Sequence, residues 1–224
     1  MTIKWSYLGL TEFESALKLQ HELRTQVLEG GKTDYLLLLS HPPTITRGYS
    51  ERSDAGLVEP RERLEAEGIK IIDVDRGGRT TYHGPDQLIG YMIFDLKRRK
   101  LKTREFVQKV AEAIVTMLDS YGIESFYDES DPGVMVGPAK IAFLGFNIQK
   151  EVTTHGFALN VGRDIKAFSY IVPCGKMGRK ITSMEELVGR AFSTFDVYWR
   201  VVTALGAGLG EIMEEVAVEA DLIL

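Results

Sequence analysis

The sequence contains one cysteine, Cys174, and its neighbours place it in a turn. Pro173 precedes the cysteine and Gly175 follows it, a combination typical of a tight turn rather than of a core helix or strand. A thiol has a pKa of about 8.5, so a nearby cation is needed to raise its thiolate fraction at neutral pH. With such a neighbour Cys174 could act as a nucleophile, whereas a lone buried cysteine is commonly only a small hydrophobic residue.

Several cations could lie beside this thiol, and the sequence alone does not choose among them. Lys140 begins the apolar run from Ile141 to Phe146, where a lysine is usually solvated. If its amine instead folds over an apolar pocket, the charged form is disfavoured and the lysine can act as a base. The candidates for the cation are therefore His41, His83, His155, Lys140, Lys176 and Lys180.

The segment from Arg76 to Gln87 has the densest group of polar side chains, and it follows a predicted strand. Gly77 and Gly78 let the main chain approach a ligand closely, while the arginine, tyrosine and histidine beside them supply donors and an aromatic wall. The alternative is a plain polar turn between strands. The spacing matches neither a phosphate-binding loop nor a dinucleotide fingerprint, and no histidine pair has metal-ligand spacing. We therefore expect no cofactor and no metal.

Length and composition bound the class of protein. A chain of 224 residues, 44% of them hydrophobic, suits a single domain covering residues 1–224. One cysteine excludes an internal disulfide, and no apolar run reaches the roughly 18 residues of a membrane span. The first residues lack the basic and apolar regions of a signal peptide, so we expect a cytoplasmic protein that does not bind membranes. The net charge of -5 argues against a nucleic-acid binder.

Around these residues the chain alternates between predicted strands and helices. Hydrophobic patterning predicts strands at residues 3–10, 35–40, 69–74, 88–95, 140–149 and 154–161, the last two as a candidate hairpin. Helices are predicted at residues 11–30, 60–68, 103–122 and 194–205, and after a Ser183 cap. Thr11 and Glu14 have capping-box spacing at the start of the first helix. This order predicts an α/β domain with a mixed β-sheet packed with helices.

A basic run at residues 97–104 places six cations among eight residues. The simpler interpretation is a solvated loop followed by the start of a helix. The alternative is a docking surface for an acidic partner protein, since a concentrated basic patch can steer association even when the net charge of the chain is negative.

The chain as a whole resembles the lipoyl(octanoyl) transferase family, the octanoyl-acyl carrier protein:protein N-octanoyltransferases. The resemblance runs from His41 to the helices near residue 200. Two positions depart from the family pattern: Asp86 stands where glycine is usual, and Phe143 stands where a small residue is common. The motifs that carry the resemblance are the Arg76–Gln87 segment, Lys140-Ile141, Phe143-Leu144-Gly145, His155-Gly156, Leu159-Asn160 and Pro173-Cys174-Gly175.

This resemblance implies a biotin/lipoate protein ligase-like catalytic domain and a division of roles among the residues. Cys174 would be the nucleophile, and Lys140 would lower the pKa of its thiol. The donor implied is octanoyl-acyl carrier protein, and the acceptors implied are the lipoyl domains of 2-oxoacid dehydrogenase complexes and the glycine cleavage H protein. The acyl site would be lined by Arg76, Gly77, Gly78, Arg79, Thr80, Thr81, Tyr82, His83, Phe143, Leu144, Gly145, His155, Gly156 and Phe157.

The implied reaction transfers an octanoyl, or medium-chain acyl, group through a thioester on Cys174 to a lysine, as the first step of endogenous protein lipoylation. A thioester donor already carries the free energy needed to form an amide, so the missing phosphate loop is consistent with transfer that needs no ATP. An ATP-dependent lipoate or biotin protein ligase is one alternative, and it would need ATP and Mg²⁺. A non-catalytic acyl- or carrier-binding module is the other, and it would not depend on Cys174.

Overall fold

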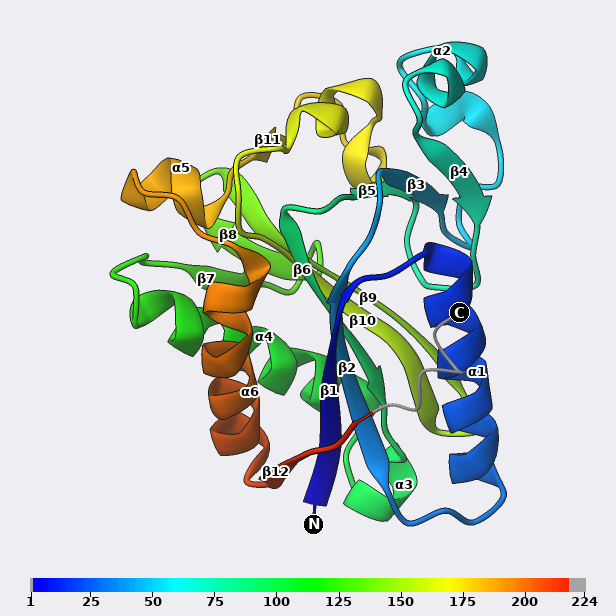
Figure 1. The fold of residues 1–224 in the computed structure, drawn as a ribbon, viewed down its shortest axis with the longest axis vertical. Coiled ribbons are helices and arrows are strands. Elements are labelled where there is room, and N and C mark those ends of the chain that lie inside the picture. The colour runs from blue at the N-terminus through cyan, green and yellow to red at the C-terminus, as the bar shows by residue number, and fades with distance from the viewer. Residues whose placement is uncertain (1, 218–224) are drawn as a thin grey trace.

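In the computed structural model, which describes residues 2–217 apart from the Cys174 side chain, strands and helices alternate along the chain (Figure 1). The strands are β1 (Thr2–Leu10), β2 (Asp34–Ser40), β3 (Thr44–Arg47), β4 (Lys70–Asp73), β5 (Thr80–His83), β6 (Gln87–Ile93), β7 (Phe126–Asp128), β8 (Gly133–Val136), β9 (Ala139–Gln149), β10 (Val152–Asn160), β11 (Lys180–Ile181) and β12 (Ile212–Glu215). The helices are α1 (Phe13–Leu28), α2 (Arg61–Ala66), α3 (Leu96–Arg99), α4 (Thr103–Asp119), α5 (Met184–Val188) and α6 (Thr194–Leu209), with short 3-10 turns η1 (Asp54–Gly56), η2 (Lys166–Tyr170) and η3 (Pro173–Gly175).

Within residues 2–217 the strands form a nine-stranded sheet and a three-stranded sheet. The large sheet has the order β12-β1-β2-β6-β10-β9-β8-β7, with β11 paired to β9, and the small sheet has the order β4-β3-β5. β1 pairs in parallel with β2 and β12, whereas the pairs from β2–β6 through β9–β8 are antiparallel. Helices α4 and α6 cover one face of the large sheet and α1 covers the other (Figure 1). The predicted α/β fold with a mixed sheet is therefore confirmed.

Burial on both faces explains the continuous apolar run of β2. Leu36 and Leu38 enter the core beneath α4 and α6, while Leu37 and Leu39 enter the core beneath α1. Successive side chains of a strand point to opposite faces, so a strand covered on both sides needs apolar residues at every position.

The predicted helices are present, but the start of one of them was wrong. Ser183 accepts a hydrogen bond from a backbone amide at the start of α5, as its cap was expected to do. The capping box before α1 does not form, because Glu12 is the N-cap residue and its side chain makes no capping bond. The Thr11 hydroxyl instead donates to the Leu8 carbonyl at 3.1 Å.

No helix in residues 2–217 is both long enough and apolar enough to cross a bilayer.

Two arginines of the basic run at residues 97–104, Arg98 and Arg99, are tied to the molecule by ion pairs. The other four cations, Lys97, Lys100, Lys102 and Arg104, are exposed, so the hypothesis of a docking surface stays a prediction that applies to them. Arg98 and Arg99 both contact the buried carboxylate of Asp34, and Arg99 also lies 2.7 Å from Glu211. The Arg99 side chain is only 2% exposed. A buried carboxylate at the start of β2 requires paired cations, and α3 supplies them.

Two short strands beside the candidate site were not predicted. β3 and β5 have four residues each, and β5 forms within the segment interpreted as a polar loop or turn. They pair antiparallel with each other, with Thr46 opposite Thr81, and so build the small sheet next to the large one. The predicted hairpin of β9 and β10 is confirmed and forms the neighbouring part of the large sheet.

Candidate active site

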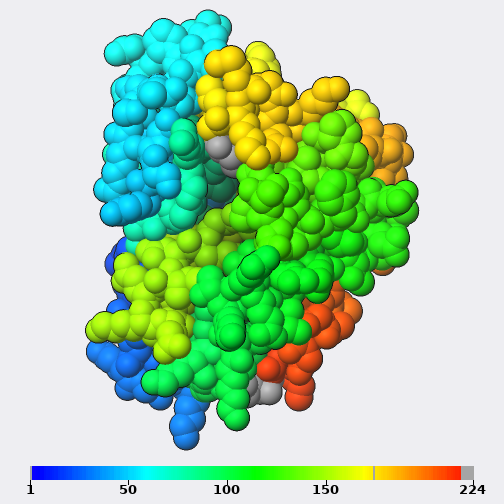
Figure 2. All heavy atoms as spheres, turned by 180° about the vertical axis from the view of Figure 1, so that it is seen from behind, coloured from blue at the N-terminus to red at the C-terminus, as the bar shows by residue number. Residues whose placement is uncertain are grey.

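A pocket lies where the small sheet meets β6, β9 and β10 of the large sheet. Figure 2 shows the surface hollowed between the cyan, gold and green parts of the chain in this region. The N-terminal end of α1 contributes Phe13 to the pocket wall. The lining residues are Phe13, Arg76, Gly77, Gly78, Arg79, Thr81, His83, Ile89, Tyr91, Pro132, Phe143, Leu144, Gly145, His155, Gly156, Phe157 and Ala158.

Among the residues expected from the sequence to bind the acyl group, all except Thr80 and Tyr82 line this pocket. These two residues belong to β5, where alternate side chains point to opposite faces. Thr80 faces the 3-10 turn η1 and donates to Glu51 at 3.3 Å. Tyr82 packs edge-to-face on Phe168, with ring centroids 5.7 Å apart. The pairing of β5 thus divides a segment that the sequence presented as one unit.

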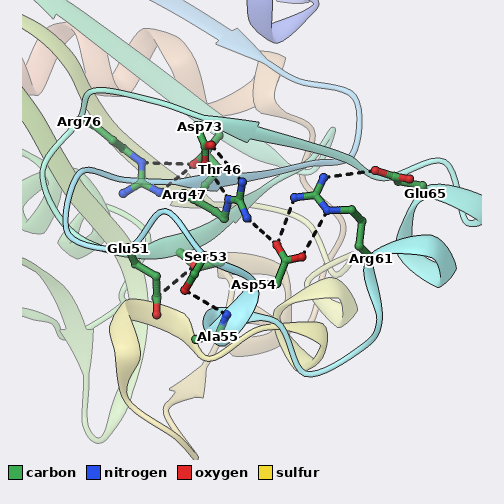
Figure 3. A network of polar contacts seen from close by, with 11 residues as sticks. Thr46, Arg47, Glu51, Ser53, Asp54, Ala55, Arg61, Glu65, Asp73 and Arg76 are labelled. Carbon is green, nitrogen blue, oxygen red and sulfur yellow. Dashed lines mark hydrogen bonds and ion pairs between the residues drawn. The ribbon is translucent and has the colours of Figure 1, made fainter.

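Hydrogen bonds from the residues that follow β3 fix the glycine-rich loop, which comprises residues 76–79. The amides of residues 48–50 donate to the carbonyls of Arg79, Arg76 and Gly78, at 3.3, 3.0 and 3.2 Å. A Cβ atom at Gly48 would lie 2.4 Å from the Gly78 carbonyl oxygen, so only glycine permits this close approach. The Arg76 guanidinium also donates to the Thr46 carbonyl and hydroxyl (Figure 3).

A network of charged side chains fixes the segment between β3 and α2 (Figure 3). Arg47 binds the Asp73 carboxylate through two nitrogens, at 2.7 and 3.0 Å, and also binds Asp54, which Arg61 contacts from α2. The anchored segment then reaches the chain that leads to the cysteine. The Gly56 carbonyl accepts from the amide of residue 172 at 2.8 Å. This segment therefore connects the glycine-rich loop to the approach of the Cys174 turn.

Three buried histidines, His41, His83 and His155, lie at or next to the pocket. Burial lowers the pKa of His41 to about 4 and holds the pKa of His83 well below its ordinary value. Burial also lowers the pKa of His155, although its hydrogen bond of 2.8 Å to Asp75 opposes that effect. Burial thus favours the neutral form of all three, which makes the lysines the better candidates for the cation that the sequence analysis sought for the thiol.

Lys140 is buried and ion-paired, an environment that matches neither of the two expected from the sequence. Its side chain is 1% exposed, and its Nζ atom lies 3.1 Å from the Asp131 carboxylate. The same ammonium lies 5.1 Å from the ring centroid of Phe143, which stacks in parallel on Phe168. A buried lysine with one carboxylate and one aromatic face is held in a defined position.

Cys174 belongs to η3, the 3-10 turn that packs against β5. The structure describes its main chain only, so the expected contact between its thiol and Lys140 stays a prediction. Two residues further along the chain, Lys176 lies 3.3 Å from the Asp131 carboxylate that also binds Lys140. The Cys174 turn and Lys140 are therefore brought to the same part of the molecule.

Sequence reasoning missed Asp131, Phe13 and Tyr91 as parts of this region. Asp131 follows a run of acidic residues that resembles an exposed turn, and Tyr91 lies within an ordinary apolar strand. No local signal separates them from structural residues, because their role depends on partners distant in sequence. Among residues 2–217, no group of three histidine, cysteine, aspartate or glutamate side chains is placed to hold a metal ion.

Comparison with known proteins relates this arrangement to a family. Residues 12–206 match the family model described as the lipoyl protein ligase A/B catalytic domain. A protein of Caldicellulosiruptor saccharolyticus named octanoyltransferase is 40% identical over 212 residues, which cover 94% of this chain and 90% of that protein. A protein of Solibacter usitatus with the same name is 42% identical over 184 residues, covering 82% of this chain and 83% of that one.

Solved structures share the fold at low sequence identity. A crystal structure of lipoate-protein ligase A bound with ATP has a TM-score of 0.82 at 16% identity, covering 99% of this chain and 91% of that one. A bi-partite lipoate protein ligase from Thermoplasma acidophilum has a TM-score of 0.79 at 16% identity, covering 99% and 89%. A biotin protein ligase from Aquifex aeolicus has a TM-score of 0.56 at 12% identity, covering 93% and 70%. The biotin/lipoate ligase-like fold is confirmed, and the chain belongs to the lipoyl protein ligase A/B catalytic-domain family.

Proposed function

We propose that this protein is an octanoyltransferase, which moves an octanoyl group from octanoyl-acyl carrier protein to a lysine of a lipoyl domain. The observation that carries this proposal is the 40% identity to a protein named octanoyltransferase over 94% of the chain. The pocket supports it, because apolar walls can hold an acyl chain while a glycine-rich main chain and polar side chains can hold its carbonyl.

In the first step the Cys174 thiolate attacks the carbonyl carbon of the donor thioester. The tetrahedral oxyanion is stabilised by backbone N–H groups near Cys174 or in the glycine-rich loop. The bond to the carrier sulfur then breaks, and an acyl thioester remains on Cys174. Lys140 gives the proton of its ammonium to the leaving carrier thiolate and becomes a neutral amine.

In the second step the acceptor lysine needs a base. A free lysine has a pKa of about 10.4, so only about one acceptor in 2,500 is neutral at pH 7. Lys140, neutral after the first step, takes a proton from the acceptor ammonium and returns to its charged form. The acceptor amine attacks the acyl thioester, an amide forms, Cys174 leaves as thiolate, and the second amine proton passes to solvent. One lysine thus serves both steps.

The proposal includes the setting of the reaction. The whole chain, residues 1–224, acts as a single cytoplasmic catalytic domain without cofactor. Its acceptors are the lipoyl domains of 2-oxoacid dehydrogenase complexes and the glycine cleavage H protein. Neither a nucleic acid nor a membrane takes part.

An ATP-dependent lipoate ligase is the second candidate, because a solved structure with the same fold is bound with ATP. Fold alone does not separate the two activities, since one fold commonly serves several chemistries. Transfer from a thioester donor in the absence of ATP and Mg²⁺ favours the transferase. Activity that requires both would favour the ligase, and binding without turnover would favour a non-catalytic module.

The decisive experiment is the intact mass of the protein after mixing with octanoyl-carrier protein. A gain of one octanoyl group, mapped by peptide analysis to Cys174, is expected. Cys174→Ala should keep the circular dichroism spectrum and gain no mass, because Cys174 is the only thiol of the chain. Normal turnover by this variant would disprove the assignment of the nucleophile.

The role of Lys140 is tested separately. Lys140→Met should raise the pKa of the Cys174 thiol and block aminolysis, because the cation beside the thiolate and the base are both removed. The rate of thiol alkylation as a function of pH measures the first effect. An unchanged alkylation profile would show that Lys140 does not act on the thiol.

A further inference from the structure

The carboxylate of Asp131 contacts three cations, two of which belong to the loop that carries Cys174. Its Oδ1 atom lies 3.1 Å from the Lys140 Nζ atom, and its Oδ2 atom lies 3.3 Å from the Lys176 Nζ atom. The Oδ2 atom also accepts a hydrogen bond from Arg179. Lys140 donates a further bond, 3.1 Å long, to the main-chain carbonyl of Asp131. Only 9% of the Asp131 side chain is exposed, so solvent screens this junction weakly.

Main-chain bonds attach the same loop to Lys140 on its other side. β11 pairs in parallel with β9, where Ile181 lies opposite Lys140, and the Thr182 amide donates to the Lys140 carbonyl at 3.1 Å. Before β11, the Lys176 amide donates to the Pro173 carbonyl at 3.0 Å and closes the turn that contains Cys174. Asp131 therefore supplies the side-chain half of a double attachment between Lys140 and this turn.

The balance of charge shows why the attachment depends on Asp131. Burial raises the pKa of the Asp131 carboxyl, but the charges of Lys140 and Arg179 outweigh burial, and the pKa lies below its ordinary value. The carboxylate is therefore ionised at neutral pH, with three cations around it. Without it, three like charges would face one another, and Lys176, already 50% exposed, would turn toward solvent.

We propose that Asp131 is a positioning residue, which holds the Lys140 ammonium and the Cys174 turn against each other through one shared carboxylate. This inference rests on the proposed function, in which Lys140 and Cys174 carry out the acyl transfer. Asp131 itself contacts neither the acyl group nor the reacting atoms in this scheme. It acts through Lys140 and through the two loop cations.

The sign of the change in thiol pKa tests the proposal. Asp131→Asn removes a negative charge, and a pure field effect of that charge would lower the pKa of the Cys174 thiol. Loss of position has the opposite sign, because Lys140 and the turn separate and the thiolate loses its cation. We expect the midpoint of alkylation against pH to rise by about one pH unit. We also expect a larger change in kcat than in the KM for the donor. A lower or unchanged midpoint overturns the proposal.

Matched variants separate position from general damage to the fold. Glu129 lies two residues before Asp131, and its exposed carboxylate pairs with Arg104. Glu129→Gln should leave the alkylation profile against pH unchanged. Asp131→Glu keeps the carboxylate and should restore part of the shift. Arg179→Gln releases the loop while leaving the pair of Asp131 and Lys140, so it should shift the midpoint in the same direction by less. If Asp131→Asn does not fold, Asp131→Glu decides the question instead, because it keeps the negative charge and a smaller rise of its midpoint then reports changed position alone.

Coupling to Lys140 distinguishes failure of this inference from failure of the proposed function. In a Lys140→Met background, Asp131→Asn should add no further rise in the alkylation midpoint, because no ammonium is then left for Asp131 and the loop to hold beside the thiol. If Lys140→Met alone moves the midpoint and Asp131→Asn does not, the proposed function stands and the positioning role of Asp131 is overturned. If Lys140→Met has no effect, the proposed dyad itself is wrong.

Discussion

Replacing Gly133 with alanine should displace the ammonium of Lys140 from Asp131. Gly133 begins β8, and a Cβ atom there would lie 2.0 Å from Lys140 Cε, 2.8 Å from Lys140 Nζ and 2.6 Å from the Ala142 carbonyl oxygen. Carbon atoms in contact normally lie about 3.5–4.0 Å apart. Either the lysine side chain must leave its present path, or β8 and β9 must separate.

The size of the effect follows from these contacts. Overpacking a buried site costs about 1–3 kcal/mol, and removing one partner of a buried ion pair costs about 3–5 kcal/mol. Because the added methyl group displaces the ammonium rather than deleting it, we expect the free energy of unfolding to fall by about 2–4 kcal/mol. Loss of about 1.4 kcal/mol of transition-state stabilisation is tenfold in rate, so we expect transfer to fall at least tenfold.

Urea unfolding and a single-turnover acylation assay measure the two effects on Gly133→Ala. Gly208→Ala is a matched control, because a Cβ atom there would lie in ordinary contact, 3.4 Å from the Ala113 Cβ atom. This control lies in α6, where alanine favours the helix over glycine by about 1 kcal/mol, so stability should rise and transfer should not change. Wild-type stability together with wild-type transfer in Gly133→Ala would refute the inference that a methyl group at this position displaces the Lys140 side chain.

Three further outcomes are expected. Phe143→Leu should lose the stacking on Phe168 and destabilise the fold by about 1–2 kcal/mol, as measured by chemical unfolding. It should also raise the KM for the acyl donor, and an unchanged KM would mean that Phe143 does not contact the acyl chain. Arg99→Met should cost about 3 kcal/mol because it leaves Asp34 and Glu211 short of a cation, whereas the exposed Lys97→Met should change the urea midpoint little. Acidification from pH 6.5 toward pH 4 should destabilise the protein, because the pKa of His41 falls from 6.5 to about 4 on folding and the unfolded chain takes up the proton first. The loss in the free energy of unfolding from this histidine is up to about 3 kcal/mol. His41→Gln should therefore flatten the dependence of stability on pH.

Local patterns in the sequence were sufficient for the main elements of the large sheet and its helices. The apolar run of β2 and the helical spacing of α4 depend on residues close together in the chain, and both were predicted correctly. β3 and β5 were missed because a strand of four residues has too little periodicity to be recognised before its partner is known. The capping box before α1 failed because Thr11 had a competing carbonyl nearby.

The family resemblance also came from the sequence, because several separated motifs occurred in the right order, and the comparisons confirm it. The motifs did not reveal which of their side chains face the pocket. Thr81 and His83 face it while Thr80 and Tyr82 do not, and this division appears only when β5 pairs with β3. The alternation of a strand gives two faces, but only the tertiary structure decides which face meets the cavity.

Residue types and spacing in the sequence determined the fold class, the family and the candidate chemistry of Cys174 and Lys140. Tertiary structure decided what the charged groups do. Arg98 and Arg99 belong to the basic run at residues 97–104, yet they bind the buried carboxylate of Asp34. Asp131, which no sequence motif singles out, binds Lys140 and two cations of the loop that carries Cys174. Helix and strand patterns are set by near neighbours along the chain, whereas the energy of a charge depends on burial and on partners that folding brings from far away.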